Sequence, residues 1–254
     1  MTLIGIAGIH SRITRRQRAL WLVAIPLTGF AVLLGVISPE APHTGGPADL
    51  AFTGQMIAIF SGIAYAAAFS DFFTDPARLG IHELEAASPV HGVILRGGRV
   101  LGTFSVVVAP SFLALLILGT VQTIIGNPWA IPAAVAVLAT IVGPAALIAL
   151  LISGVAGTLL PRAFGRIVAV LIWFWLAFST PLLPIPTVNG TIFGAIGDTI
   201  GAGYFGAPTF YPPAGPLAAD PTPLTATLSL LWQLTLIAIL LVAGTQLGER
   251  SRNR

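Results

Sequence analysis

The arginine residues of this 254-residue chain fall in four groups, and two apolar stretches joined by an arginine-free loop separate each group from the next. The groups are Arg12, Arg15, Arg16 and Arg18; Arg78, Arg96 and Arg99; Arg162 and Arg166; and Arg250, Arg252 and Arg254. Cytoplasmic loops retain Lys and Arg, whereas translocated loops lose them. One topology therefore places all 12 cations on the same side: six spans with both termini in the cytoplasm.

The composition agrees with a membrane protein. Hydrophobic residues make up 56% of the chain and charged residues only 8%, against about 25% charged residues in soluble domains. The apolar runs are long and unbroken, unlike the alternating segments of a β-barrel. We therefore predict an all-α integral membrane protein that crosses the inner (plasma) membrane several times. The use of Arg without Lys and the abundance of Ala suggest a bacterial source.

The predicted architecture is an N-terminal interfacial helix over residues 1–18 and one transmembrane domain over residues 19–254. A span needs about 20 apolar residues. The six predicted spans cover about 19–38, 50–69, 100–125, 129–160, 167–183 and 224–247. Pro132 and Pro144 predict a kink or a re-bonded turn in the fourth span, since proline leaves a carbonyl without its helical partner.

Two segments outside the spans also have helical periodicity. Leu3, Ile6, His10 and Ile13 follow three- and four-residue steps, which indicates a short helix in the membrane interface, with a frayed tail as the alternative. The loop between spans five and six is about 40 residues long, unusual for a structureless connection. Its apolar residues Ile192, Ile196 and Ile200 repeat every four residues, with Tyr204 next. We expect one or two short re-entrant helices there, on the outer side.

Several chemistries are excluded by residues that the chain lacks. It has no cysteine and no lysine, so it carries neither disulfides nor a lysine-dependent phosphate-binding loop. No ionisable residue falls in the central part of a predicted span, which argues against proton- or sodium-coupled transport. The small excess of positive charge lies beside apolar spans and favours contact with membrane lipid; we predict no nucleic-acid partner. No catalytic, cofactor-binding or metal-binding residue is predicted.

A few side chains within the spans are candidates for a substrate pathway. Trp173, Trp175 and Phe178 concentrate aromatic bulk in span five, where a pathway lining, a subunit contact and a lipid-facing surface are all open interpretations. Gln233 lies deep in span six, where an interhelical hydrogen bond is favoured over a substrate contact. Gln55 and Gln122 lie near span ends, where they can reach the interface.

The segment between spans two and three carries the most specific pattern. Ser88 and Pro89 form a helix start, with Ser as the N-cap and Pro at the first helical position. Val90, Val93 and Ile94 make one apolar face. We expect Arg96 to end this short helix and Gly97-Gly98 to terminate it before span three. Such a helix could dock into a groove on a soluble partner or rest on lipid.

The run Glu83-Leu84-Glu85, Ser88-Pro89-Val90 and Gly98-Arg99-Val100-Leu101-Gly102 resembles the first cytoplasmic loop of ATP-binding-cassette (ABC) type-2 permeases. The resemblance covers nearly the whole chain, because that family has six spans, inner termini, an N-terminal interfacial helix, a cytoplasmic coupling helix and re-entrant helices between spans five and six. It implies a homo- or heterodimer of permeases bound to two separate ABC ATPase subunits. The residues that would face the ATPase are Glu83, Glu85, Ser88, Pro89, Val90, His91 and Arg96. The chain departs from some members in lacking a sizeable outer domain.

Three functions follow as hypotheses. The first is an export permease for a drug-like, lipid or amphipathic compound, not itself an enzyme. The second is a membrane-embedded enzyme that acts on a lipid-linked substrate, for which Asp71 and Asp75 are the nearest approach to a carboxylate pair. The third is a small accessory or sensor subunit.

Overall fold

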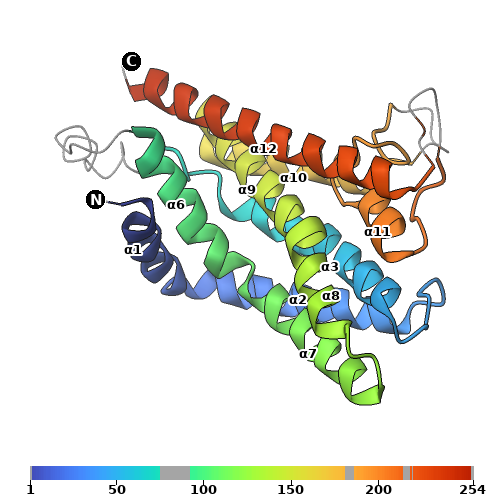
Figure 1. The fold of residues 1–254 in the computed structure, drawn as a ribbon. Coiled ribbons are helices and arrows are strands. Elements are labelled where there is room, and N and C mark those ends of the chain that lie inside the picture. The colour runs from blue at the N-terminus through green and yellow to red at the C-terminus, as the bar shows by residue number, and fades with distance from the viewer. Residues whose placement is uncertain (1, 75–91, 181–185, 214–217, 219, 253–254) are drawn as a thin grey trace.

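The computed structural model describes residues 2–74, 92–180, 186–213, 218 and 220–252, and the regular elements among them are all helices. In chain order these are α1 (Leu3–Arg15), α2 (Arg18–Ile37), α3 (Pro47–Ala68), α6 (Gly92–Val107), α7 (Ala109–Ile125), α8 (Ala130–Val137), the π-helix η1 (Leu138–Val142), α9 (Gly143–Leu159), α10 (Arg162–Phe178), α11 (Asp198–Phe205) and α12 (Pro223–Arg252). Figure 1 shows both termini, α1 and the start of α6 at one end of the bundle and α11 at the other. The all-α prediction is confirmed for this part of the chain.

Four helices are long and apolar enough to cross a membrane: Leu20–Ile37, Pro47–Ala68, Ala130–Leu159 and Pro223–Arg250. The pair Ile94–Val107 and Ala109–Ile125, which is bent by 45°, makes a fifth candidate if the two helices count as one span. The fifth predicted span corresponds to α10, which begins five residues before the predicted start and has only 17 residues. At 1.5 Å per residue that is about 26 Å, less than the roughly 30 Å of a hydrocarbon core.

The bend between α6 and α7 lies at Val108, two residues before Pro110. Proline has no N–H to continue the helical ladder, so it disrupts the hydrogen bonds of the preceding turn. The hydroxyl of Tyr65 on α3 donates to the Val107 carbonyl at 2.9 Å. A neighbouring helix thus satisfies a backbone group at the bend, as membrane-embedded bends require.

The prediction for Pro144 is also confirmed, as a re-bonded turn. Residues Leu138–Val142 form a π-helix immediately before α9, and the Gly143 N–H bonds to the Leu138 carbonyl five residues back. Because the π-turn takes one more residue than an α-turn, it accommodates a proline within a helix that runs unbroken from Ala130 to Leu159.

The prediction that Gly97-Gly98 ends a helix is wrong. α6 runs without interruption from Gly92 to Val107, so Arg96 lies inside a helix and does not end one. The reason is close packing against α1. A methyl group at Gly98 would come within 2.8 Å of the Ile6 side chain, and one at Gly102 would overlap the Ala7 carbonyl. These glycines allow α1 and α6 to approach closely, and that contact outweighs their low helix propensity.

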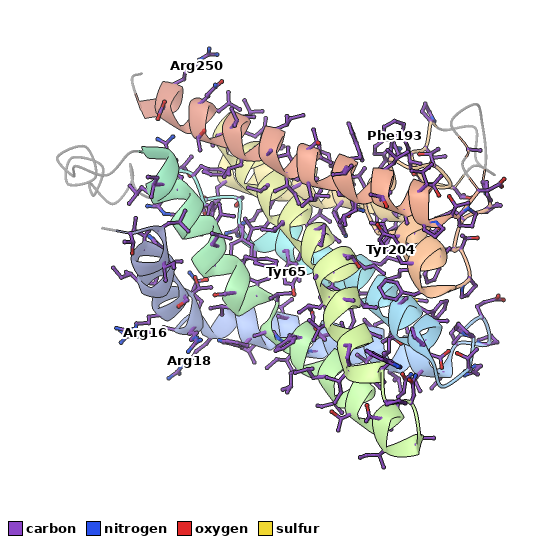
Figure 2. The ribbon with its side chains drawn as sticks, viewed as in Figure 1. Arg16, Arg18, Tyr65, Phe193, Tyr204 and Arg250 are labelled. Carbon is purple, nitrogen blue, oxygen red and sulfur yellow. The ribbon has the colours of Figure 1, made fainter. Side chains whose placement is uncertain are left out.

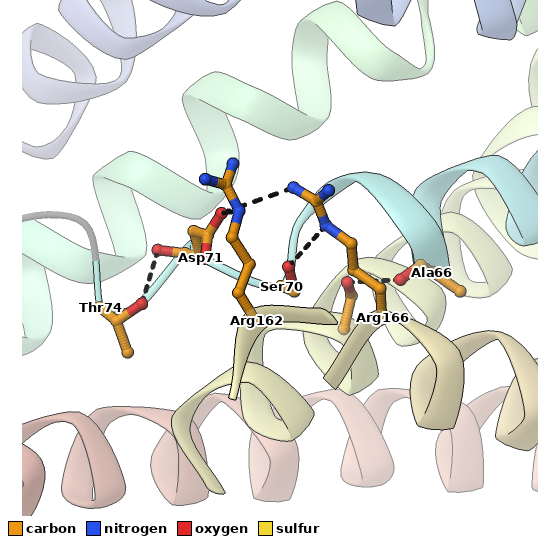
Figure 3. A network of polar contacts seen from close by, with 7 residues as sticks. Ala66, Ser70, Asp71, Thr74, Arg162 and Arg166 are labelled. Carbon is orange, nitrogen blue, oxygen red and sulfur yellow. Dashed lines mark hydrogen bonds and ion pairs between the residues drawn. The ribbon is translucent and has the colours of Figure 1, made fainter. Parts of the chain in front are cut away.

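The centre of the bundle is the packing of α3 against α9 and α10. The candidate spans of α3 and α8–α9 are 78% and 67% buried, whereas those of α2 and α12 are 28% and 17% buried. The stripe of small residues predicted in span four packs within the molecule: the Ser153 hydroxyl donates to the Ala66 carbonyl, and Gly157 lies against the Ser70 carbonyl. Ion pairs connect the segment after α3 to the start of α10: Asp71 pairs with Arg162 (2.5 Å) and with Arg166 (3.6 Å), as Figure 3 shows.

We expect Gly157→Ala to destabilise the protein, because its new methyl group would overlap the Ser70 carbonyl, a backbone atom that cannot rotate away. Overpacking of this kind costs about 1–3 kcal/mol, which thermal unfolding of the purified protein in detergent would reveal as a lower midpoint. The matched control is Gly29→Ala in α2, where nothing lies within 4 Å of the new methyl group. Equal midpoints for the two variants would contradict the packing described here.

Candidate functional site

The most elaborate polar structure in the described chain is the segment 186–211, which we call the cap segment. It covers the end of the bundle opposite the termini (Figure 1) and contains α11. Ile196 and Ile200 are fully buried, whereas Tyr204 is exposed. The predicted four-residue repeat is therefore helical only over Asp198–Phe205, and Ile192 and Ile196 precede that helix.

Two buried glutamines hold the cap segment on the bundle. Gln55 of α3 donates through Nε2 to the carbonyls of Gly197 (3.3 Å) and Asp198 (3.4 Å). Gln233 of α12 donates through Nε2 to the carbonyls of Gly194 (2.9 Å) and Ala195 (3.4 Å). The Gly197 carbonyl also accepts the Gly201 N–H at 2.8 Å, so Gln55 binds the first turn of α11, whereas Gln233 binds carbonyls of the irregular backbone before that helix.

The two glutamines differ in how well the sequence predicted them. For Gln233 the sequence favoured a hydrogen bond to another helix over a substrate contact. It does make a hydrogen bond to a distant segment, but its partner is the cap segment and not another span. Gln55 was expected to reach the interface, but it has no exposed surface and lies beneath Gly201, where any side chain would overlap its amide. The expectation for Gln55 is wrong because the cap segment covers the N-terminal part of α3.

Asp198 connects the start of α11 to residues 210–211 at the end of the cap segment. No role was predicted for it from the sequence. Its carboxylate accepts hydrogen bonds from the backbone N–H groups of Phe210 (2.9 Å) and Tyr211 (3.2 Å). Burial raises its pKa to about 6, against the lowering effect of those two bonds. The sequence held one indication: an acidic residue stands within a short apolar repeat, and acidic residues are favoured at helix N-termini.

Phe210 and Tyr211 in turn contact α3 and α10. The Phe210 ring stacks on Phe52 of α3 at 4.8 Å, and the Tyr211 hydroxyl donates to the Ala177 carbonyl near the end of α10 at 2.5 Å. Asp198 thus fixes a turn that contacts α3 and α10 at once.

Asn189 is part of the same structure. Its side chain is 1% exposed, and its Nδ2 donates to the Ser179 carbonyl at 2.8 Å. Asn189-Gly190-Thr191 matches the acceptor pattern for N-glycosylation. In the folded protein, however, the Asn189 amide is buried and hydrogen-bonded, so it is not accessible to a glycan.

The structure does not bring the four predicted pathway residues together. Trp173 is fully buried and its indole N–H donates to the Ile59 carbonyl at 3.0 Å, whereas Trp175 is exposed and bonds to the Pro186 carbonyl. Phe178 is half-buried and stacks on Phe174 at 4.5 Å. Together with Gln233 beneath the cap segment, they occupy separate positions.

A small pocket of about 170 Å³ lies elsewhere, where α2 ends, α3 begins and α7 ends. It is lined by Gly35, Val36, Ala41, His43, Asp49, Leu50, Thr53, Leu118 and Gln122. The Asp49 carboxylate beside it is already occupied by the backbone N–H groups of Thr44 and Gly45. The lining is mainly apolar and contains none of the four predicted pathway residues.

Most of the predicted ATPase-facing residues, Glu83, Glu85, Ser88, Pro89, Val90 and His91, lie outside the described residues, as does Asp75. Arg96 is described, and it is directed to α12: its Nη1 donates to the Thr245 carbonyl and pairs with Glu249, both at 2.9 Å. This contact joins the start of α6 to the C-terminal end of α12.

The alternative hypothesis, a membrane-embedded enzyme, relied on Asp71 and Asp75, and Asp75 lies outside the described residues. Asp71 is mostly buried and paired with Arg162 and Arg166 (Figure 3). Within the ranges that the structure describes, no group of three or more His, Cys, Asp or Glu side chains is placed to hold a metal ion.

No protein-family model matches this sequence, and no curated protein sequence is significantly similar to it.

We expect Gln55→Leu and Gln233→Leu to loosen the cap segment, because each removes buried side-chain hydrogen bonds that join a span to the backbone of this segment. Such a loss costs about 1–3 kcal/mol. Hydrogen exchange of the amides in residues 189–211 would rise in both variants. Gln246→Leu on the exposed surface of α12 is the matched control and should leave the exchange unchanged; a rise in the control as large as in the variants would argue against the two clamps.

The raised pKa of Asp198 predicts a pH dependence of stability. The folded protein holds this proton up to a pH of about 6, whereas the unfolded chain releases it near 4. Folding is therefore favoured below pH 4, and that contribution, about 3 kcal/mol, is lost as the pH rises through 6. Thermal unfolding midpoints between pH 4 and 7 should fall with pH in the natural protein and change less in Asp198→Asn. Parallel curves for the two proteins would contradict the prediction.

Proposed function

We propose that this chain is the membrane-spanning permease subunit of an ABC transporter, an exporter of a drug-like, lipid or amphipathic compound. In this proposal a second permease copy completes the pathway, and two separate ATPase subunits hydrolyse ATP. The chain has six spans, with α10 as the fifth, and both termini in the cytoplasm of a bacterial cell.

The observation that carries the proposal is the position of α6. It begins at Gly92, directly after residues 75–91, and it contains Arg96 and residues 98–102 of the run that resembles type-2 permeases. α6 packs on α1 through Gly98 and Gly102, and Arg96 joins it to α12. A partner bound at residues 75–91 would therefore act directly on a helix that contacts both the N-terminal helix and the last span.

The bend at Val108 is the position at which α6 could move relative to α7. α6 and α7 meet at 45°, and the bond from Tyr65 to the Val107 carbonyl connects the bend to the buried helix α3. In this proposal a displacement of α6 changes this angle, since the hydrogen-bond ladder is already interrupted at Val108 before Pro110.

The distribution of arginine supports the proposed sidedness. The arginines that the structure describes belong to the end of the bundle that holds the termini, where Arg16, Arg18 and Arg250 are labelled in Figure 2. The cap segment and the α2–α3 connection at the opposite end contain no arginine. Retention of arginine in the cytoplasm explains this difference.

Co-purification with an ATPase tests the proposal. We expect an ATPase with a phosphate-binding loop, encoded beside this chain, to co-purify with it and to lose at least about tenfold in recovery with Glu83→Arg or Ser88→Arg, since a reversed or added charge at a docking surface opposes binding. Glu40→Arg, an equal charge reversal at the exposed end of α2, is the matched control and should retain the ATPase.

Failure of any such ATPase to co-purify, or equal loss with Glu83→Arg and Glu40→Arg, would overturn the proposal. Hydrolysis of a lipid-linked substrate that disappears with Asp71→Ala would instead support the membrane-embedded enzyme.

A further inference from the structure

The arginines at the terminal end of the bundle are of two kinds. Arg96, Arg162 and Arg166 each pair with an acidic side chain, Glu249 or Asp71. Arg12, Arg15, Arg16 and Arg18 are exposed, and no ion pair joins any of them to another residue of the described chain. Residues 1–39 contain no Asp or Glu. Four cations within seven residues therefore have no acidic neighbour along their own segment.

These cations lie beside exposed apolar side chains on α1. Ile9 and Arg12 are three residues apart, and so are Ile13 and Arg16, which places each isoleucine next to an arginine on the helix surface. Ile9 and Ile13 are 44% and 53% exposed. The opposite face of the helix, with Ile6 and Thr14, is buried against α6. An exposed strip of arginine and isoleucine is the surface that an anionic membrane interface would cover.

The strip is held in a fixed orientation. Close contacts of Gly98 and Gly102 with α1, and the 3.4 Å contact between the hydroxyls of Thr14 and Thr103, fasten α1 to α6. The Trp21 indole N–H donates to the Arg15 carbonyl at 2.9 Å and fixes the corner between α1 and α2. A surface that is already ordered avoids the entropy cost of ordering on binding.

The charge of the strip comes from arginine alone. His10 on the same helix has its pKa lowered to about 4 by burial and by the nearby Arg99, so it is neutral at physiological pH. Arginine stays charged at every accessible pH and matches phosphate with paired N–H groups. The span of α2 begins at Leu20, directly after these arginines, which sets them at the depth of the lipid headgroups. In Figure 2, Arg16 and Arg18 extend away from the bundle.

We propose that α1 and the α1–α2 corner form a binding surface for anionic phospholipid headgroups of the surrounding membrane. Phosphate groups bind the guanidinium groups of Arg12, Arg15, Arg16 and Arg18, while Ile9 and Ile13 enter the acyl boundary. Each arginine near such a surface contributes roughly a fivefold preference for anionic lipid at low salt. The proposal requires only that the chain spans a membrane and does not depend on the transport function.

The absence of cysteine allows a site-specific test. A fluorophore on Gln17→Cys, an exposed site between Arg16 and Arg18, reports lipid contacts in nanodiscs through quenching by nitroxide-labelled lipids. Ala163→Cys, exposed at the same end beside the paired Arg162, is the control site. We expect labelled phosphatidylglycerol to associate near Gln17→Cys at least about tenfold more strongly than labelled phosphatidylcholine, and the preference at Ala163→Cys to be much smaller.

Charge removal separates the proposal from general attraction to a basic protein. Arg12→Gln with Arg16→Gln should reduce the preference at Gln17→Cys by roughly tenfold or more, and 500 mM salt should weaken it. Arg250→Gln, which neutralises an exposed cation at the end of α12, should leave it unchanged. Equal quenching by the two lipids at Gln17→Cys, or a preference that survives Arg12→Gln with Arg16→Gln, would overturn the proposal.

Discussion

The constraint on which this structure depends is that backbone carbonyls packed among apolar helices need hydrogen-bond donors. A regular helix supplies them internally, but this chain leaves the regular helix at a bend, at a proline and in the cap segment. Each departure is satisfied in a different way. Tyr65 donates to the carbonyl at the Val108 bend, η1 re-bonds the turn before Pro144, and Gln55 and Gln233 donate to the cap segment. Tyr65 and Gln233 thus serve irregular backbone elsewhere in the fold, and Gln55 joins α3 to the start of α11.

The helical class and most span positions were predictable, because apolar length and the placement of arginine follow directly from the membrane environment. α2, α3, the α8–α9 helix and α12 begin and end near the predicted residues. The effect of Pro144 was also predictable, since proline removes a specific donor.

What the sequence did not predict depends on contacts between segments distant in the chain. Gly97 and Gly98 match a helix end locally, but packing against α1 keeps them helical. Gln55 is in the N-terminal half of α3, and only the return of the cap segment about 140 residues later buries it. Asp198 gains its partners, Phe210 and Tyr211, by the folding of the cap segment. Local pattern carries no information on these contacts.

The proposed transport function and the proposed lipid surface meet in α1. This helix contacts α6, which follows the proposed coupling region, and it presents unpaired arginines to the headgroup layer. If both proposals hold, the lipid composition of the leaflet would act on the helix that the ATPase is proposed to move. Binding energy from lipid would then favour one position of α1 over another, which is the condition for a ligand to shift a conformational equilibrium.

The contact of Gly157 with the Ser70 carbonyl has a consequence for how the molecule can move. At this point the backbones of α9 and of the segment after α3 touch without an intervening side chain, whereas between α10 and α3 the Trp173 ring fills the space beside Gly62. Surfaces that interlock so closely cannot slide without opening a gap. α3 and α9 therefore resist displacement relative to each other, and a rearrangement is easier at α2 and α12, whose candidate spans are 28% and 17% buried.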